Sequence, residues 1–285
     1  MNLKSRITMK SLAILFAGLV LMQGQAWADA GVKTMSDKDA TALRKVIAGD
    51  HRSAKNRSRD VFRHPFETLS FMGLRSDMTV AEILPGGGWY MEIIAPFLKQ
   101  KGRYYGANWA NDDPRERYRG FLKRFKKKVA SRADLYGSVT VTEFAKNKLN
   151  FAAPGSADMV LTFRNLHNWP KRGTRKRYMK AIFKVLKPGG ILGVVDHRAN
   201  DKLAVDPKAL SGYVHESQMM EYAKEAGFRF LAKSNINANY RDMTQHPEGV
   251  WTLPPSLRMK DKYRDKYMAI GESDRLTMKF IKPAG

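Results

Sequence analysis

The stretch that most constrains the fold is Val80 to Ala95, VAEILPGGGWYMEIIA. It starts as a short apolar strand, passes through three consecutive glycines and continues as an amphipathic helix. A chain that turns from strand to helix on glycine brings bare backbone N–H groups and a helix N-terminus to one point. That geometry suits a nucleotide-like ligand at the edge of an α/β sheet.

Segments with strand and helix character alternate along the chain after residue 66. Ile191 to Asp196 (ILGVVD) is uniformly apolar, as a strand buried on both faces is, whereas Arg275 to Ile281 (RLTMKFI) alternates like an antiparallel strand. The repeated units predict a doubly wound α/β fold: a mostly parallel seven-stranded sheet with an antiparallel last strand. The predicted strands cover Thr79–Leu84, Arg103–Ala107, Ser138–Thr142, Ala157–Phe163, Ile191–Asp196, Phe228–Ala232 and Arg275–Ile281.

The first residues have the pattern of a secretory signal peptide: a basic start, a short apolar run, and small residues where a signal peptidase cleaves. These parts are Lys4, Arg6 and Lys10; Leu12–Met22; and Ala26-Trp27-Ala28. We expect residues 1–28 to be removed by cleavage after Ala28 and the mature protein to be periplasmic; an uncleaved anchor is the alternative. The absence of cysteine fits export. We expect residues 29–65 to form a helical arm on a domain that covers residues 66–285.

The chain is strongly basic, with a formal net charge of +24 at pH 7, and subtracting the three basic residues of the expected signal leaves +21. Such a field attracts polyanions. The segment from Arg115 to Arg132 concentrates basic residues around an apolar stripe of Phe121, Leu122, Phe125 and Val129. It is either a docked helix with a solvated basic face or a surface that binds anionic membranes or polyanions. We find no motif for sequence-specific binding of nucleic acid.

Three segments, in order along the chain, carry a resemblance to a known family. They are Glu82–Gly88 (EILPGGG), Ala157–Trp169 (ADMVLTFRNLHNW) and Phe183–Val195 (FKVLKPGGILGVV). Together they resemble the first, fourth-strand and fifth-strand motifs of class I S-adenosylmethionine-dependent methyltransferases. The chain also resembles a subfamily of predicted exported methyltransferase-like proteins that carry PGGGWY, TFRNLHNW and GVWTLPP segments. The resemblance implies a Rossmann-like methyltransferase fold, S-adenosylmethionine as cofactor, and methyl transfer to a small-molecule or envelope acceptor.

The resemblance also assigns cofactor-binding positions after the first strand. Glu82 takes the place of the acid that orients bound water or the cofactor's ammonium group. The backbone of Gly86, Gly87 and Gly88 takes the place of the turn that approaches the amino-acid part of the cofactor. Leu84 stands where the family has its first glycine, but three adjacent glycines still leave a permissive turn.

Further cofactor-binding positions follow the second, third and fourth strands. Asn108 stands where the family has an acid that accepts hydrogen bonds from both ribose hydroxyls, and an amide can accept one such bond. Trp109 either stacks on the adenine or belongs to the core. Glu143 and Phe144 match the positions that meet the adenine, and Thr162 lies where the fourth strand reaches the cofactor.

The segment after the fourth strand, ending in RNLHNW, is dense in hydrogen-bonding side chains. His167 is the candidate general base because the unperturbed pKa of histidine lies near neutrality. Arg164 is the candidate for holding an anionic group of the substrate, and Asn165 for orienting it. The alternative is a structural network that ties the strand to the next helix. Asp196 and His197 follow the fifth strand on the same edge, but without the spacing of a metal site, so we expect no metal.

A long polar and aromatic segment, residues 234–274, precedes the last strand, and we interpret it as a lid over the strand ends. Two functions stay open. The first is methyl transfer to an acceptor; the alternative is a non-catalytic periplasmic protein that uses this fold to hold a small molecule or an anionic envelope component. Export favours the alternative, since S-adenosylmethionine is made in the cytoplasm, whereas the polar loop around His167 favours the enzyme. The sequence carries no signal for the oligomeric state.

Overall fold

The computed structural model describes residues 34–284. From Met35 onward the chain forms one compact unit around a seven-stranded sheet with the strand order β3-β2-β1-β4-β5-β7-β6. The expected signal peptide, residues 1–28, and the first residues of the expected arm lie outside the described residues. In the described part, no helix combines the length and the apolar character needed to cross a bilayer.

The sheet has the predicted organisation. The first five strands pair in parallel, and β7 runs antiparallel between β5 and β6. The prediction of a mostly parallel seven-stranded sheet with an antiparallel last strand is therefore confirmed. The strands are β1 (Thr79–Ile83), β2 (Arg103–Asn108), β3 (Val139–Glu143), β4 (Ala157–Phe163), β5 (Leu186–His197), β6 (Arg229–Ser234) and β7 (Arg275–Ile281).

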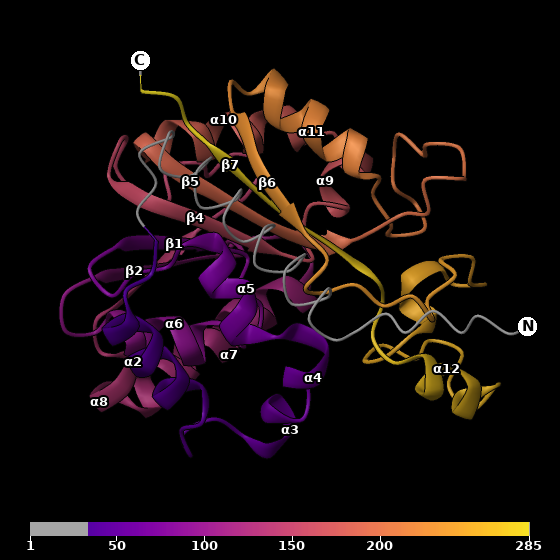
Figure 1. Ribbon diagram of the computed structural model, residues 1–285, viewed down its shortest axis with the longest axis horizontal. Helices are drawn as coiled ribbons and strands as arrows, with labels where there is room; N and C mark the ends of the chain where they lie inside the picture. The colour runs from indigo at the N-terminus through magenta and orange to yellow at the C-terminus, as the bar shows by residue number, and fades with distance from the viewer. Residues whose placement is uncertain (1–33, 285) are drawn as a thin grey trace, which may run out of the picture. The chain divides into compact units, whose positions relative to one another are not determined.

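Helices cover both faces of the sheet (Figure 1). On one face, α10 lies against β5 and α11 against β6; on the other, α6 lies against β2, and α2 packs on both α5 and α6. Four helices, α2 to α5, come from the segment before the first strand. The helices are α2 (Asp37–Ile47), α3 (Ala54–Arg57), α4 (Asp60–Arg63), α5 (Pro65–Met72), α6 (Met91–Leu98), α7 (Glu116–Ser131), α8 (Ala133–Tyr136), α9 (Asn168–Lys171), α10 (Arg175–Val185) and α11 (Glu216–Glu225).

Local chemistry explains where the first described helix begins and ends. The hydroxyl of Ser36 accepts a hydrogen bond from the backbone N–H of Asp39 (3.1 Å), which satisfies one of the free donors of the first turn. Asp37 lies in the same turn, and Arg44 and Lys45 lie in the last one. Acids at the N-terminus and bases at the C-terminus complement the helix dipole, so α2 is stable as an element of the unit.

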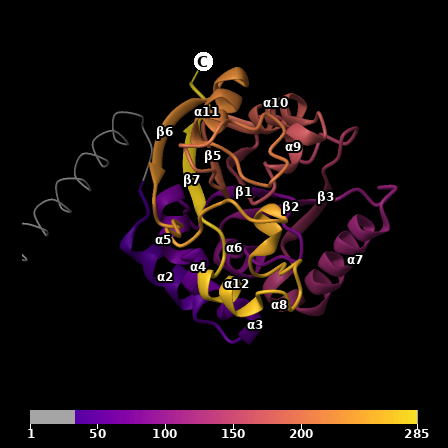
Figure 2. The ribbon, with the colours of Figure 1, turned by 90° about the vertical axis from the view of Figure 1, so that its right-hand side faces the viewer.

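The segment between β6 and β7 lies over the carboxyl edge of the sheet, which faces the viewer in Figure 2. It contains a short 3-10 helix, η1 (Gly249–Thr252), and α12 (Arg264–Ile270). Asp242 fixes this segment internally: it accepts the hydroxyl of Tyr213 and the backbone N–H of Asp274, and it pairs with His246 at 2.8 Å. The segment is thus a packed cover with its own buried hydrogen bonds.

Candidate active site

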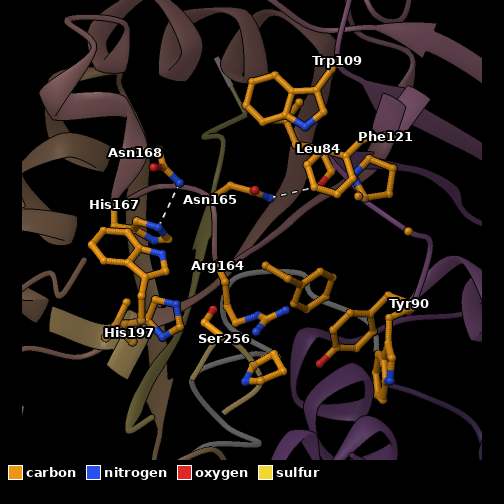
Figure 3. Close-up of a pocket in the computed structure, with 18 of the residues that line it drawn as sticks. Leu84, Tyr90, Trp109, Phe121, Arg164, Asn165, His167, Asn168, His197 and Ser256 are labelled. Atoms are coloured by element: carbon orange, nitrogen blue, oxygen red, sulfur yellow. Dashed lines mark hydrogen bonds between the residues drawn. The ribbon is translucent and has the colours of Figure 1, made fainter. Parts of the chain in front are cut away.

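A cavity of about 740 Å³ opens at the carboxyl edge of the sheet. Its volume is within the range of small-molecule sites. The lining comes from α3 and α4, the glycine turn after β1, the residue after β2, α7, the segment after β4, the end of β5 with the loop that follows it, and the segment between β6 and β7. Figure 3 shows how side chains from these parts face one another across the cavity. Parallel sheets bind ligands at this edge, so the cavity is the candidate active site.

The glycine turn presents bare backbone to the cavity. Gly86 has a φ of +58°, and a Cβ built on it would meet no described atom within 4 Å; the same space lies open beside Gly87. Gly88 is different, because a Cβ there would lie 3.0 Å from Met91 and 3.2 Å from Phe125. Gly86 and Gly87 therefore line the cavity, whereas Gly88 lets α6 and α7 approach the turn.

Leu84 adopts the backbone conformation that glycine would have adopted at its position. Its φ is +53°, in the left-handed region that costs a non-glycine residue ~1–2 kcal/mol. Its N–H donates to the carbonyl of Ala107 (2.7 Å), and the amide of Asn165 donates to the carbonyls of Ile83 (3.0 Å) and Leu84 (3.3 Å). The amide hydrogens of Asn165, expected to orient substrate, are thus used to hold the strained turn.

Besides Gly88, four of the residues assigned to the cofactor lie outside the cavity lining. Asn108 is fully buried, and its side-chain oxygen accepts the N–H of Trp109 (2.9 Å) instead of facing a ribose. Glu143 binds Lys148 (2.5 Å), and Phe144 packs in the core. Thr162 is buried within β4. Asn108 and Glu143 are hydrogen-bonded within the fold, and Phe144 and Thr162 are buried, so none of the four side chains lines the cavity and their assignment to the cofactor stays a prediction.

Trp109 does line the cavity. Its indole packs on the ring of Tyr118, with 4.1 Å between centroids, and Figure 3 shows it at the end of the cavity near Leu84 and Phe121. The guanidinium of Arg172 lies 5.4 Å from the same indole. Trp109 was predicted either to stack on a ligand or to belong to the core. In the structure it is largely buried, and its ring also lines the cavity.

Glu82 is a buried carboxyl beside the turn. The hydroxyl of Tyr104 donates to it at 2.5 Å, and Glu82 belongs to the cavity lining. Burial raises the pKa of Glu82 to about 7, although the Tyr104 hydroxyl and the charge of Arg63 act against the rise. At neutral pH the carboxyl is therefore divided between its charged and uncharged forms, which makes it a proton-exchanging group within the cavity.

His167 and Asp196 form an oriented imidazole–carboxylate pair. The Nδ1 atom of His167 lies 2.8 Å from Oδ1 of Asp196, and the backbone N–H of His167 donates to Oδ2 (2.9 Å). Asp196 is fully buried and also accepts the N–H of His197 (2.8 Å). A proton on Nδ1 leaves Nε2 as the basic nitrogen, and in this structure Nε2 accepts a hydrogen bond from the side-chain NH2 group of Asn168 (2.9 Å). This is the geometry of a positioned general base.

His197 lies beside this pair, with 5.1 Å between the two imidazole centroids. Burial lowers the pKa of His197 well below its usual range, and the neighbouring His167 and Arg164 lower it further, so the ring is neutral at pH 7. The potential ligand atoms of His167, Asp196 and His197 lie within 4.8 Å of one another, which is compatible with a metal ion. The Nδ1 atom of His167 already faces Asp196, and that of His197 faces Ser273. Arginines also surround the group, so its chemistry favours an imidazole base over a metal site.

Arg164 points into the middle of the cavity in Figure 3. It too has a positive φ, +58°, and the surrounding structure holds it there through a hydrogen bond from its N–H to the carbonyl of Val195 (2.7 Å). Its guanidinium is one of several that approach the carboxylate of Glu272. Burial lowers the pKa of Arg164 to about 10, so its charge is retained at neutral pH.

Sequence reasoning missed several residues that line the cavity or hold it. Arg59 and Arg63 come from the arm, and the rings of Tyr90 and Phe163 stack at 3.6 Å between centroids. Trp251, which belongs to the segment predicted as a lid, lines the cavity from η1. The GVWTLPP segment was a signal for Trp251, and the FRN segment for Phe163, but the arm carries no motif that marks its arginines.

The match to a known family comes from the middle of the chain. Residues 85–194 match a family model described as a methyltransferase domain. The matched stretch covers less than half of the chain and is similar to this family, and the strand order of the sheet is that of the same fold. No curated protein sequence matches the chain significantly. The family match and the fold support S-adenosylmethionine as the cofactor.

Solved structures confirm the fold. An S-adenosylmethionine-dependent methyltransferase from Aquifex aeolicus is similar with a TM-score of 0.53 and 16% identity, over 85% of this chain and 98% of that one. The [4+2]-cyclase SpnF is similar with a TM-score of 0.54 and 16% identity, over 87% and 94%. A putative sarcosine dimethylglycine methyltransferase from Galdieria sulphuraria has a TM-score of 0.53 and 15% identity, over 81% and 89%.

The cavity fits the cofactor at its amino-acid end. Gly86 and Gly87 leave the space that a Cβ would fill, and Trp109 offers an aromatic surface. The fit is poorer at the ribose, because Asn108 is buried and its side-chain oxygen is already hydrogen-bonded. The side chains that would hold S-adenosylmethionine are thus fewer than the resemblance implied, and the backbone of the glycine turn carries most of the fit.

Proposed function

We propose that this protein transfers a methyl group from S-adenosylmethionine to a small-molecule acceptor. One observation carries the proposal: the open glycine turn and His167, which is paired with the buried Asp196, line the same cavity. A site that only binds a ligand has no need of a basic nitrogen backed by a buried carboxylate. The methyltransferase-domain match and the fold support the same reaction class.

Each residue has a defined task in the proposed reaction. S-adenosylmethionine, when bound, supplies an electrophilic methyl group. The backbone of Gly86 and Gly87 holds its amino-acid part, and Trp109 packs against its ring system. His167 accepts the proton of the acceptor through Nε2, while Asp196 stabilises the imidazolium that forms. Most of the rate enhancement comes from alignment of the two reactants.

Arg164 is the residue proposed to hold an anionic group of the acceptor, and it extends into the cavity between His197 and Tyr90 in Figure 3. Asn165 takes part indirectly, because its amide fixes the carbonyls of Ile83 and Leu84 and so the shape of the turn. Substrate alignment therefore depends on a residue that contacts the ligand and on one that shapes the surrounding backbone.

Calorimetry with S-adenosylhomocysteine tests the cofactor claim. Gly86→Val should abolish binding, because the side chain enters the space meant for the ligand. Gly155 provides the matched control: its φ is +63°, a Cβ there also meets no described atom within 4 Å, and it lies outside the cavity lining. Gly155→Val carries the same backbone strain and should bind normally. If the wild-type protein gives no heat of binding at millimolar ligand, the cofactor claim is refuted, and a non-catalytic binding protein becomes the better description.

We further propose that the protein is exported to the periplasm, belongs to the exported methyltransferase-like subfamily, and associates electrostatically with anionic surfaces. The signal pattern and the net charge of +24 support this proposal. N-terminal sequencing of protein from its native compartment should start at Asp29; an intact chain starting at Met1 in the cytoplasm would contradict export. Binding to anionic vesicles should fall steeply with salt, and binding that persists at high salt would exclude a purely electrostatic attraction.

A further inference from the structure

Four arginines surround one carboxylate beside the cavity, and three of these arginines line it: Arg59, Arg63 and Arg164. The carboxylate is that of Glu272, just before β7. It accepts a hydrogen bond from Arg275, and it lies 2.5 Å from Nε of Arg59, 3.8 Å from Nε of Arg63 and 4.0 Å from Nη1 of Arg164. One negative charge faces four positive charges, so the cluster itself lacks counter-charges. We call these five residues the arginine cluster.

Arg63 is the least satisfied member of the arginine cluster. It is only 4% exposed, it lines the cavity, and its guanidinium lies over the ring of Trp89 (4.5 Å to the centroid). In the described part of the chain, its Nε and Nη2 atoms have no hydrogen-bond partner, and neither does Nη2 of Arg59. Buried donors of this kind are rare in native proteins and costly, above all when they carry a charge. Their position beside a cavity indicates that a ligand supplies the missing acceptor.

The position of the cluster relates it to the acceptor side of the cavity. Arg275 pairs in register with His197 on β5, and the backbone of Arg164 is bonded to Val195 on the same strand. The cluster thus lies beside the ends of β4, β5 and β7, next to the imidazole pair. The glycine turn follows β1, and it has open backbone N–H groups of its own for the cofactor.

We propose that the arginine cluster binds an oxyanion group, a carboxylate or a phosphate, of the methyl acceptor. The identification of the ligand as the methyl acceptor rests on the proposed function, whereas the binding of an oxyanion does not. Guanidinium groups match the planar geometry of such groups and donate two parallel hydrogen bonds to them. Glu272 holds the arginines in place in the empty site, and the ligand's anion supplies the second counter-charge.

Binding of inorganic phosphate, at ionic strength held constant with chloride, tests the site directly. Calorimetry should detect binding to the wild-type protein and a loss of at least tenfold in Arg63→Met. Arg164→Met changes a more exposed member of the cluster and should lose affinity for phosphate likewise. This second variant keeps the test valid if Arg63→Met fails to fold. Glu272→Gln should bind phosphate at least tenfold more tightly, because the internal competitor is gone.

Arg172 provides the matched control, since it lines the same cavity at the opposite end, near Trp109. Arg172→Met should keep the wild-type affinity for phosphate. An equal loss in Arg172→Met and Arg63→Met would overturn the proposal, because the binding would then be a general effect of positive charge. Absence of phosphate binding to the wild-type protein would overturn it as well.

S-adenosylhomocysteine separates the two possible sources of the anion. If phosphate binds equally well to protein saturated with S-adenosylhomocysteine, the anion belongs to the acceptor. Competition between the two ligands would assign the cluster to the cofactor's own carboxylate and refute the acceptor assignment. If phosphate binds and S-adenosylhomocysteine does not, the cluster stands while the proposed methyl transfer fails.

Discussion

Replacement of Glu272 by glutamine removes the one carboxylate that the four arginines share. Burial on its own raises the pKa of Glu272, but the charges of Arg275, Arg59, Arg63 and Arg164 outweigh burial and lower the pKa from 4.5 to about 2. Each pKa unit corresponds to ~1.36 kcal/mol, so the ionised carboxylate contributes about 3 kcal/mol at neutral pH. This agrees with the ~3–5 kcal/mol expected when one partner of a buried charge pair is removed.

Urea unfolding at pH 7 in a chloride buffer is the assay for Glu272→Gln. The variant should lose about 3 kcal/mol of unfolding free energy relative to the wild type. Added phosphate should restore much of the loss, since a ligand at a hundred times its dissociation constant contributes ~2.7 kcal/mol. Because the pKa of Glu272 is depressed, its contribution is present above pH 4.5 and is lost as the pH falls towards about 2. The two proteins should therefore approach equal stability in acid.

Glu225→Gln is the control for this prediction. Glu225 pairs with Arg175 at 2.6 Å, but its side chain is 36% exposed, so its removal should cost less than ~1 kcal/mol. Phosphate should stabilise Glu225→Gln no more than the wild type. The reasoning is refuted if Glu272→Gln costs no more than Glu225→Gln, or if phosphate stabilises both variants equally.

Three further predictions concern the proton chemistry and the cover of the cavity. His167→Ala should lower the rate of methyl transfer by ~10²–10⁴-fold, whereas His246→Ala, which breaks an equally short imidazole–carboxylate pair outside the cavity lining, should leave the rate nearly unchanged; equal losses would make His167 structural. Burial raises the pKa of Glu82 from 4.5 to about 7, so the wild type should lose about 3 kcal/mol of unfolding free energy as the pH rises through this range. Denaturant titrations should show no such fall in Glu82→Gln. Trp251 covers the cavity, and its ring lies 4.7 Å from Nζ of Lys171. Trp251→Ala should therefore raise KM more than it lowers kcat. A larger effect on kcat than on KM would assign Trp251 to the chemical step.

The fold was predictable because its signals are local. Apolar runs bounded by glycine and proline mark the strands, and the predicted limits of β4, Ala157–Phe163, and of β7, Arg275–Ile281, agree with the structure. The antiparallel direction of β7 was visible in its alternation, although the strand is buried along its whole length. The helix α7, Glu116–Ser131, lies within the basic segment Arg115 to Arg132, and it buries Leu122 and Phe125 of the predicted apolar stripe.

The site was predictable only where chemistry follows a strand directly. His167 and Arg164 come within a few residues of the end of β4, so the sheet edge positions them. Asn108 also ends a strand, yet its side chain bonds to the next backbone N–H, a local alternative that asparagine offers and the position does not reveal. Arg59 and Glu272 meet across more than two hundred residues of chain, and the sequence carries no periodic signal for such a contact.

The unfavourable features of this molecule gather around one cavity. Leu84 and Arg164 have left-handed backbones, Glu82 is a buried carboxyl with a pKa of about 7, and Arg63 is a buried cation without enough partners. Features like these persist when the surrounding structure enforces them, and they accompany binding and catalysis. A scaffold that had lost its ligand would gain stability by losing each of them. Their joint presence therefore supports a working site, and the oriented base at His167 favours a site that performs a reaction over one that only holds a ligand.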